Sequence, residues 1–168
     1  MCMFKFLKKM PEKLIGEYLT DNNLTISTAE SCTGGLVSSR LTDIAGSSNY
    51  IRENYVTYAN EAKSKLLGVR EETLIQYGAV SEQCAREMAS GLLKRTGSDI
   101  VLCTTGIAGP GGGTKDKPVG TMYVAAKNKH TTKVKKINIH KKYERKKMKY
   151  VFSQKALEVL LELIEEEL

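Results

Sequence analysis

Short strand-like runs alternate with helical patterns along this chain, and the alternation constrains the fold more than any other feature. Strands are expected at 24–28, 50–59 and 99–104, where β-branched and other apolar residues are bounded by turn residues. Helices are expected at 11–22, 35–42, 61–67, 71–77 and 81–96, where apolar residues recur at helical spacing. Strands that are separated by helices become parallel neighbours in a sheet with helices on its faces.

The end of the chain adds an antiparallel part to this pattern. Strands are expected at 119–126 and 133–140 around a hairpin turn at 127–130, and a long helix is expected from 145 to 168. The expected fold is therefore α/β, a three-layer α/β/α sandwich with a mixed, mostly parallel sheet. With 168 residues and no repeat or linker, we expect a single domain over 1–168, in which residues 1–10 form an N-terminal extension that we leave unassigned.

Several classes of protein do not fit the composition. No apolar run reaches the roughly 18–20 residues of a membrane span, and the order of charges at the N-terminus is not that of a secretory signal. The four cysteines are scattered without a C-x-x-C pair, and there are two histidines, so a zinc site is not expected. We expect free thiols in a reducing cytoplasm, no membrane contact, no metal and no cofactor.

The net charge of +7 is concentrated in one region. Between 115 and 149 the basic residues face two acids, Asp116 and Glu144, whereas residues 156–168 are rich in Glu. Such a region can bind nucleic acid or a small anion, and the alternative is a solvated lysine-rich surface. Few aromatic residues interleave with these lysines, which weakens a model of base stacking on single strands.

The segment 28–35 is the first candidate for chemistry. It lies between a predicted strand and a predicted helix, where backbone amides at the helix start face the space above the sheet. It carries two hydroxyls and a thiol, Ser31, Cys32 and Thr33, followed by Gly34 and Gly35. Each of the three side chains is a candidate nucleophile at this stage.

A serine nucleophile needs a neighbouring base. His130 falls in the predicted hairpin turn and His140 near the end of a basic strand, so a Ser-His-Asp triad is disfavoured. A lysine serves as the base when burial lowers its pKa. Lys63 follows the strand at 50–59 as Ser31 follows the strand at 24–28, so adjacent strands would bring Lys63, Tyr58 and Ser31 into one crevice. The alternative is that Lys63 is a surface lysine on the helix.

The segment 104–113 is a third polar loop directly after a predicted strand. Its glycines, among them Gly106, Gly109, Gly111 and Gly112, let backbone amides approach an anion closely. The spacing is neither that of a P-loop nor that of a dinucleotide-binding fingerprint. The alternative is a mobile turn without a ligand.

Four blocks of residues together resemble the CinA C-terminal domain family, from about residue 11 to residue 161. The blocks are Thr28-Ala-Glu-Ser-Cys-Thr-Gly-Gly35, Val56-Thr-Tyr-Ala-Asn-Glu-Ala-Lys63, Gly78-Ala-Val-Ser81, and Thr105-Gly-Ile-Ala-Gly-Pro-Gly-Gly-Gly113 with Lys117-Pro-Val-Gly120. Family members that are enzymes are nicotinamide-nucleotide amidases. Many members also carry an N-terminal molybdopterin-binding-like domain, and this chain resembles the stand-alone form.

The resemblance implies hydrolysis of the carboxamide of nicotinamide mononucleotide to nicotinate mononucleotide and ammonia, in pyridine nucleotide salvage. It implies Ser31 as the nucleophile and Lys63 as the base, with Tyr58 assisting or relaying the proton. Cys32 is expected to be a packing neighbour that points away from the substrate. The resemblance also implies a homodimer.

The resemblance further implies where the substrate is held. Candidate donors to the oxyanion are the amides of the Thr33-Gly34-Gly35 turn and the hydroxyl of Thr105. Candidate contacts to the phosphate are the loop from Gly109 to Gly113 and Arg145, and Gly106 is a further candidate for substrate binding.

The chain departs from the family near its C-terminal end. The family has Gly-Asp-Arg followed four residues later by a second Arg, and here Tyr143-Glu-Arg145 is followed by Lys149. Lysine keeps the charge but lacks the two-pronged guanidinium. Two alternative functions stay open: a non-catalytic member of the same fold that binds a nucleotide or a protein, and a nucleic-acid-binding protein linked to competence or DNA damage.

Overall fold

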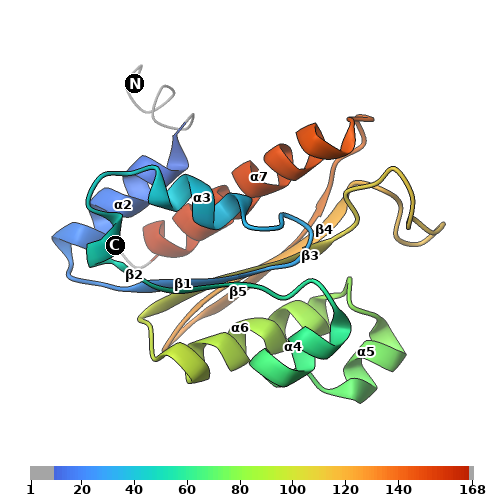
Figure 1. Ribbon diagram of the computed structural model, residues 1–168, viewed down its shortest axis with the longest axis horizontal. Helices are drawn as coiled ribbons and strands as arrows, with labels where there is room; N and C mark the ends of the chain where they lie inside the picture. Colours follow the sequence, from blue (N-terminus) through green and yellow to red (C-terminus); the bar gives the residue numbers. More distant parts are fainter. Residues whose placement is uncertain (1–9, 167–168) are drawn as a thin grey trace.

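A five-stranded mixed sheet forms the centre of the protein (Figure 1). The computed structural model describes residues 10–166; most of the unassigned N-terminal extension, Cys2 and the expected helix end at 168 lie outside the described residues. The strands are β1 (Ile26–Glu30), β2 (Ile51–Val56), β3 (Ile100–Gly106), β4 (Thr121–Asn128) and β5 (Thr132–Asn138), in the order β2-β1-β3-β4-β5. The β2-β1-β3 pairings are parallel and the β3-β4-β5 pairings antiparallel, so every strand except β4 runs in one direction. The expected mixed, mostly parallel sheet is confirmed.

Helices cover both faces of this sheet, which confirms the expected three layers (Figure 1). One face carries α2 (Pro11–Asp21), α3 (Leu36–Thr42) and α7 (Arg145–Glu165), and the other carries α4 (Asn60–Leu67), α5 (Glu71–Tyr77) and α6 (Glu82–Thr96). A short 3₁₀ turn, Ser47–Asn49, precedes β2. None of the helices within residues 10–166 has the length and apolarity to cross a membrane.

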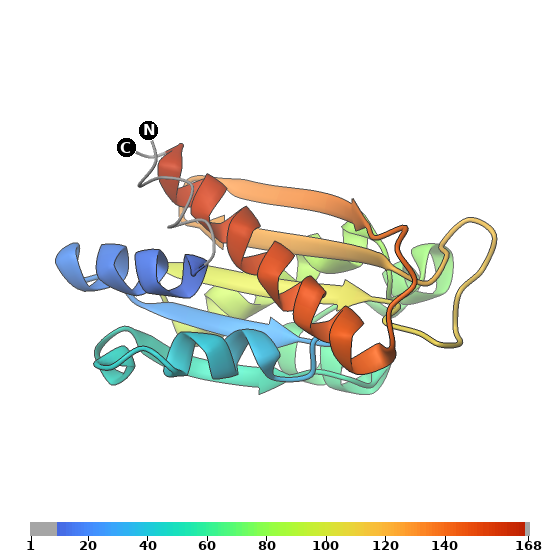
Figure 2. The ribbon, with the colours of Figure 1, turned by 90° about the horizontal axis from the view of Figure 1, so that it is seen from above.

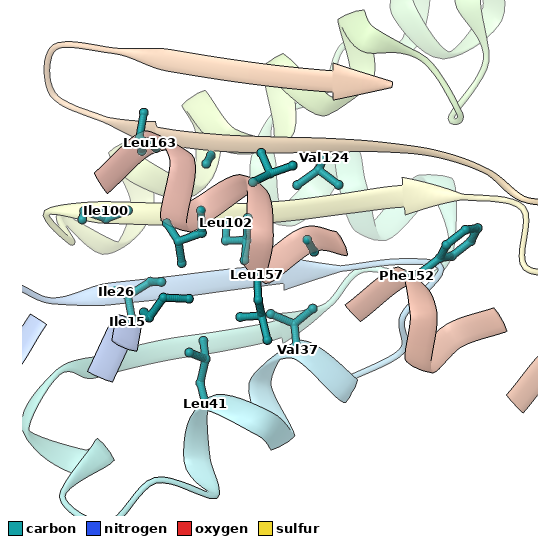
Figure 3. Close-up of a cluster of buried hydrophobic side chains, with 14 of the residues drawn as sticks. Ile15, Ile26, Val37, Leu41, Ile100, Leu102, Val124, Phe152, Leu157 and Leu163 are labelled. Atoms are coloured by element: carbon teal, nitrogen blue, oxygen red, sulfur yellow. The ribbon is translucent and has the colours of Figure 1, made fainter. Parts of the chain in front are cut away.

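The long helix α7 crosses the strands obliquely and packs against both α3 and the sheet (Figure 2). Between these elements lies the larger apolar cluster, with side chains from α2, α3, α7 and the sheet (Figure 3). Val37 of α3, Leu157 of α7 and Leu102 of β3 are each at most 1% exposed. Burial of side chains of this size contributes about 1.5–3 kcal/mol each, which holds the start of α3 in place beside the end of β1.

The predicted strand boundaries are shifted by one to three residues, and the largest shift is in β2, which was expected at 50–59 and ends at Val56. The first strand was expected at 24–28, but β1 begins at Ile26 because the amide of Leu24 bonds back to the carbonyl of Leu19, the end of α2. The hairpin turn also comes later, because the side-chain oxygen of Asn128 accepts from the amides of His130 and Thr131. The shift of β1 matters for the site, because β1 now ends directly before Ser31.

The basic region and the acidic chain end partly neutralise each other. Lys133 and Lys135 of β5 both pair with Glu162 of α7, and Lys133 also pairs with Glu166. The fold thus brings the basic and the acidic parts of the sequence into contact. This weakens the hypothesis that this part of the surface binds nucleic acid.

Candidate active site

The carboxyl ends of the three parallel strands meet at one edge of the sheet, and a cleft of about 280 Å³ lies there. In open α/β sheets this edge is where ligands bind. Most of the predicted site residues line the cleft: Ser31, Tyr58, Lys63, Thr105, Gly106, Gly109, Gly111, Gly112 and Arg145. Thr33, Gly34 and Gly35 lie in the turn that follows Ser31 and do not line the cleft.

The alternation of side chains along β1 aims Ser31 at the α4 side of the sheet. Ile26 packs in the cluster under α3 and α7, whereas Ala29 packs under α6, on the opposite face. Ser31 continues the Ala29 side, because its amide still bonds to the carbonyl of Thr104 at 3.0 Å, as a strand residue would. The Ser31 hydroxyl therefore points toward α4, and it lies 3.2 Å from the amine of Lys63.

Lys63 is buried, with 1% of its surface exposed, whereas Lys65 on the same helix is exposed. Burial lowers the pKa of Lys63 from the ordinary lysine value. Its Nζ lies 2.9 Å from the carbonyl oxygen of Thr57 and 3.2 Å from that of Tyr58. A neutral amine has two N–H groups and one lone pair, and carbonyl oxygens can only accept. When the amine is neutral, the two carbonyls can take both N–H groups and leave the lone pair for the hydroxyl proton of Ser31, whereas the protonated amine donates to Ser31.

The thiols around this pair stay protonated. Burial raises the pKa of Cys32 to about 12 and that of Cys84 to about 11. Cys32 touches the cleft, but it is only 4% exposed and packs in the larger apolar cluster. Because a thiol without its thiolate form is a weak nucleophile, Ser31 is the stronger candidate nucleophile in this turn.

Tyr58 contacts the pair differently from the expected proton relay. The backbone carbonyl of Tyr58 accepts from Lys63, while its hydroxyl accepts from Arg145 Nη2 at 2.6 Å. The side chain of Tyr58 is 59% exposed. The phenol therefore lies with Arg145 at the mouth of the cleft rather than between Lys63 and Ser31.

Glu30 is a site residue that the sequence reasoning missed. Its buried carboxylate accepts from the hydroxyl of Thr33 and from the amide of Gly35, at 2.6 and 3.0 Å. The Gly35 amide and Thr33 hydroxyl are thus already bound, which corrects the expectation that the whole turn donates to an oxyanion. The amides of Thr33 and Gly34 make no hydrogen bond within residues 10–166 and are left for that role. The sequence signal that could have identified Glu30 is an acidic residue placed directly between a predicted strand and the start of a predicted helix.

Thr105 is also placed differently from the expectation. Its hydroxyl donates to the carbonyl of Ala79 at 2.7 Å. Because a hydroxyl has a single proton, Thr105 does not offer a second donor to an oxyanion in this arrangement. It instead ties β3 to the segment at Ala79 and Val80, which forms another wall of the cleft.

Arg145, the first residue of α7, joins two walls of the cleft. Besides its bond to Tyr58, its Nη1 donates to the carbonyl of Gly109 at 2.6 Å. Gly109 adopts a φ of +78°, and a Cβ at this position would lie 2.6 Å from Val119, so the position needs glycine. A guanidinium has five N–H groups, and two of them are used here, so three are available to an anion.

A second cation of α7, Lys149, lies beside the turn that follows Ser31. Lys149 lies one helical turn after Arg145, on the same side of the helix. A Cβ placed on Gly34 would lie 3.0 Å from Lys149 Nζ, so the ammonium rests directly beside this glycine. The two cations together make this end of the cleft electropositive.

A larger cavity, of about 530 Å³, lies on the other side of the glycine-rich segment. It is lined by apolar groups such as Val119, Ile139 and Met148, together with His140. It contains no serine paired with a base, so the chemistry places the site at the smaller cleft. In the part of the chain that the structure describes, no group of three or more His, Cys, Asp or Glu residues is placed to hold a metal.

Comparison with known proteins supports the family resemblance that the four sequence blocks indicate. The CinA C-terminal domain family matches residues 8–164. A CinA-like protein of Chloroherpeton thalassium is 63% identical over 113 residues, which are 67% of this chain and 27% of that protein. This chain therefore spans less than a third of that relative.

Solved structures match over nearly the whole chain. The competence/damage inducible protein CihA from Agrobacterium tumefaciens is 40% identical with a TM-score of 0.88, and the match covers 94% of both chains. A competence-damaged protein (CinA) superfamily protein from Escherichia coli is 32% identical with a TM-score of 0.84, covering 91% of this chain and 88% of that one. By sequence and by fold, the chain belongs to the CinA C-terminal domain family.

Proposed function

We propose that the protein is an amidohydrolase that converts nicotinamide mononucleotide to nicotinate mononucleotide and ammonia, in pyridine nucleotide salvage. The single observation that carries the proposal is the Ser31–Lys63 pair, in which a buried amine lies 3.2 Å from a hydroxyl at the edge of a cleft. Free buried thiols at Cys32, Cys84 and Cys103 suit action in a reducing cytoplasm. A homodimer is part of the proposal and is tested by sedimentation.

The proposed reaction follows from the donors and acceptors of the pair. Ser31 attacks the carboxamide carbon while its proton passes to the neutral amine of Lys63, and a C–O bond forms. The carbonyl oxygen becomes an oxyanion, which the amides of Thr33 and Gly34 stabilise. The C–N bond then breaks, and the Lys63 ammonium returns its proton to the leaving nitrogen, which departs as ammonia. A water molecule next attacks the acyl carbon while Lys63 takes one of its protons; the ester C–O bond to Ser31 breaks, Lys63 returns the proton to Ser31 Oγ, and the product leaves as nicotinate mononucleotide.

The cations of α7 suit a substrate with a phosphate. Arg145 lines the cleft, and the ammonium of Lys149, one helical turn further along α7, lies beside Gly34 in the turn that follows Ser31. Charge-assisted hydrogen bonds to phosphate are among the stronger polar contacts. Lys149 binds as a point charge, so Arg145 supplies the directional part of this contact.

Replacing Arg145 by alanine is expected to raise KM for nicotinamide mononucleotide about 10- to 100-fold, because hydrogen bonds to charged groups contribute about 1.5–3 kcal/mol. The value of kcat should change little, since Arg145 does not touch Ser31. Initial rates across substrate concentrations separate the two constants. Lys147→Ala is the matched control, because Lys147 is an exposed cation of the same helix. A fall in kcat alone would assign Arg145 to the chemical step instead.

Incubation with EDTA is expected to leave the rate unchanged, because the proposed reaction uses an amine base and backbone donors throughout. The assay follows ammonia release before and after dialysis against the chelator. Loss of activity that returns with added Zn²⁺ or Mg²⁺ would contradict the Ser/Lys mechanism.

Ammonia release from nicotinamide mononucleotide by the purified protein is the direct test of the proposed function. Absence of release would reject the amidase and favour a non-catalytic member that binds a nucleotide or a protein. Tight DNA binding that weakens steeply with salt would favour the third reading, through exposed lysines such as Lys141, Lys142 and Lys146.

A further inference from the structure

Glu30 is a fully buried carboxylate to which the proposed mechanism gives no role. It is the last residue of β1 and lies next to Ser31, but the two side chains leave opposite faces of the sheet. Ser31 faces Lys63 on α4, whereas Glu30 faces the start of α3. Glu30 does not line the cleft. Any effect that it has on the chemistry must therefore act through the turn that follows it.

The Glu30 carboxylate is held by five hydrogen bonds. Its Oε2 accepts from Thr33 Oγ1 at 2.6 Å and from the amides of Gly35 and Val37, both at 3.0 Å. Its Oε1 accepts from the amide and the hydroxyl of Ser38, at 2.8 and 2.6 Å. The carboxylate accepts in each of these five bonds, three of them from backbone amides, which can only donate. The Glu30 side chain thus binds residues at both ends of the turn between β1 and α3.

The same carboxylate orders the hydroxyls behind the nucleophile. The single proton of Thr33 goes to Glu30, so the hydroxyl of Thr104, which is 2.8 Å from Thr33 Oγ1, donates to Thr33. The chain of donors therefore runs in one direction, from Thr104 through Thr33 to Glu30.

This network decides which amides of the turn are bound and which are free. Glu30 takes the amide of Gly35, while the amides of Thr33 and Gly34 keep no partner in the described chain. Gly34 and Gly35 hold φ angles of +60° and +94°, a conformation that the backbone leaves readily without fixed partners. The carboxylate supplies those partners from the buried side.

From this geometry we infer that Glu30 is a positioning residue for the reaction: it locks the turn so that Ser31 meets Lys63 and the free amides of Thr33 and Gly34 face the oxyanion. The inference rests on the proposed Ser/Lys chemistry but not on the identity of the substrate. A displacement of about 1 Å in a reacting group can lower a rate about 100-fold. The turn is held rigid from behind, where the substrate does not reach.

The test is Glu30→Gln, which keeps the shape but places an NH₂ group against the surrounding donors. We expect kcat for ammonia release to fall about 100-fold with KM nearly unchanged. We also expect Ser31 to react more slowly with a fluorophosphonate probe, a readout that needs no nicotinamide substrate. Thr33→Val, which removes one of the five bonds, should give a smaller loss of the same kind.

Arg40→Met is the control for destabilisation alone. Arg40 is a buried residue at the other end of α3, and its guanidinium bonds to Glu12, Ser153 and Gln154. It should lower the melting temperature while Ser31 labelling stays near that of the wild type. If Glu30→Gln and Thr33→Val label Ser31 as fast as Arg40→Met does, the positioning role is overturned. If Glu30→Gln does not fold, Thr33→Val decides alone. If the wild type labels at Ser31 but releases no ammonia, the proposed substrate fails while the inference stands.

Discussion

Replacement of Ser31 by alanine is expected to lower the rate of ammonia release by at least about 10⁴-fold, because removal of the nucleophile of a coupled pair removes nearly all covalent catalysis. The fold should be retained. Among the described residues, the Ser31 hydroxyl bonds only to Lys63, and in the variant the Lys63 amine keeps the carbonyls of Thr57 and Tyr58. Steady-state rates and the melting temperature of the purified variant are the two measurements.

Cys32→Ala is the matched control for this experiment, because Cys32 is the neighbouring candidate nucleophile in the same turn. Its pKa is raised to about 12 by burial, so its thiolate is scarce at neutral pH. The variant should lose far less activity than Ser31→Ala. The reverse result, with Ser31→Ala active and Cys32→Ala inactive, would make Cys32 the nucleophile and would leave Lys63 with another role.

The juxtaposition of Ser31 and Lys63 could be expected from the sequence because it depends on local rules. Each residue follows a strand, and the two strands are parallel neighbours, so their carboxyl ends meet at one edge of the sheet. The alternation of side chains along a strand adds the direction in which Ser31 points. Neither step needs knowledge of how a distant helix packs. The fold class was predictable for the same reason.

The contacts that differ from the sequence-based predictions depend on long-range packing and on which acceptor each hydrogen-bond donor finds. Tyr58 and Arg145 are 87 positions apart, and their bond forms because α7 begins beside the cleft, which no local pattern in the sequence indicates. Nothing in the sequence indicated acceptors for the Thr105 hydroxyl or the Gly35 amide, but these groups donate to the carbonyl of Ala79 and the carboxylate of Glu30 respectively. A motif thus identifies which residues meet, whereas the assignment of each donor requires the complete set of neighbours.

Replacement of Lys63 by methionine is expected to lower kcat about 10²- to 10⁴-fold, the usual contribution of a general base. In the wild type, kcat/KM should rise with pH as Lys63 loses its proton and then reach a plateau. The midpoint should lie below the ordinary lysine pKa of about 10.4, because burial lowers the pKa of Lys63. Lys65→Met is the matched control, since Lys65 is an exposed lysine on the same helix. It should change neither the rate nor its pH dependence.

The same substitution is expected to change how stability depends on pH. Between the lowered pKa of folded Lys63 and the higher pKa of the unfolded chain, the unfolded chain binds one more proton than the folded protein. The free energy of unfolding therefore rises with pH across this interval, and the contribution is lost as pH falls through the folded pKa. Methionine at position 63 has no proton to bind, so Lys63→Met should lack this slope. Chemical denaturation of both proteins at several pH values measures the difference. Equal slopes in the wild type and the variant would mean that Lys63 is charged in the folded protein, and the lone pair that the mechanism assigns to the Ser31 proton would not exist.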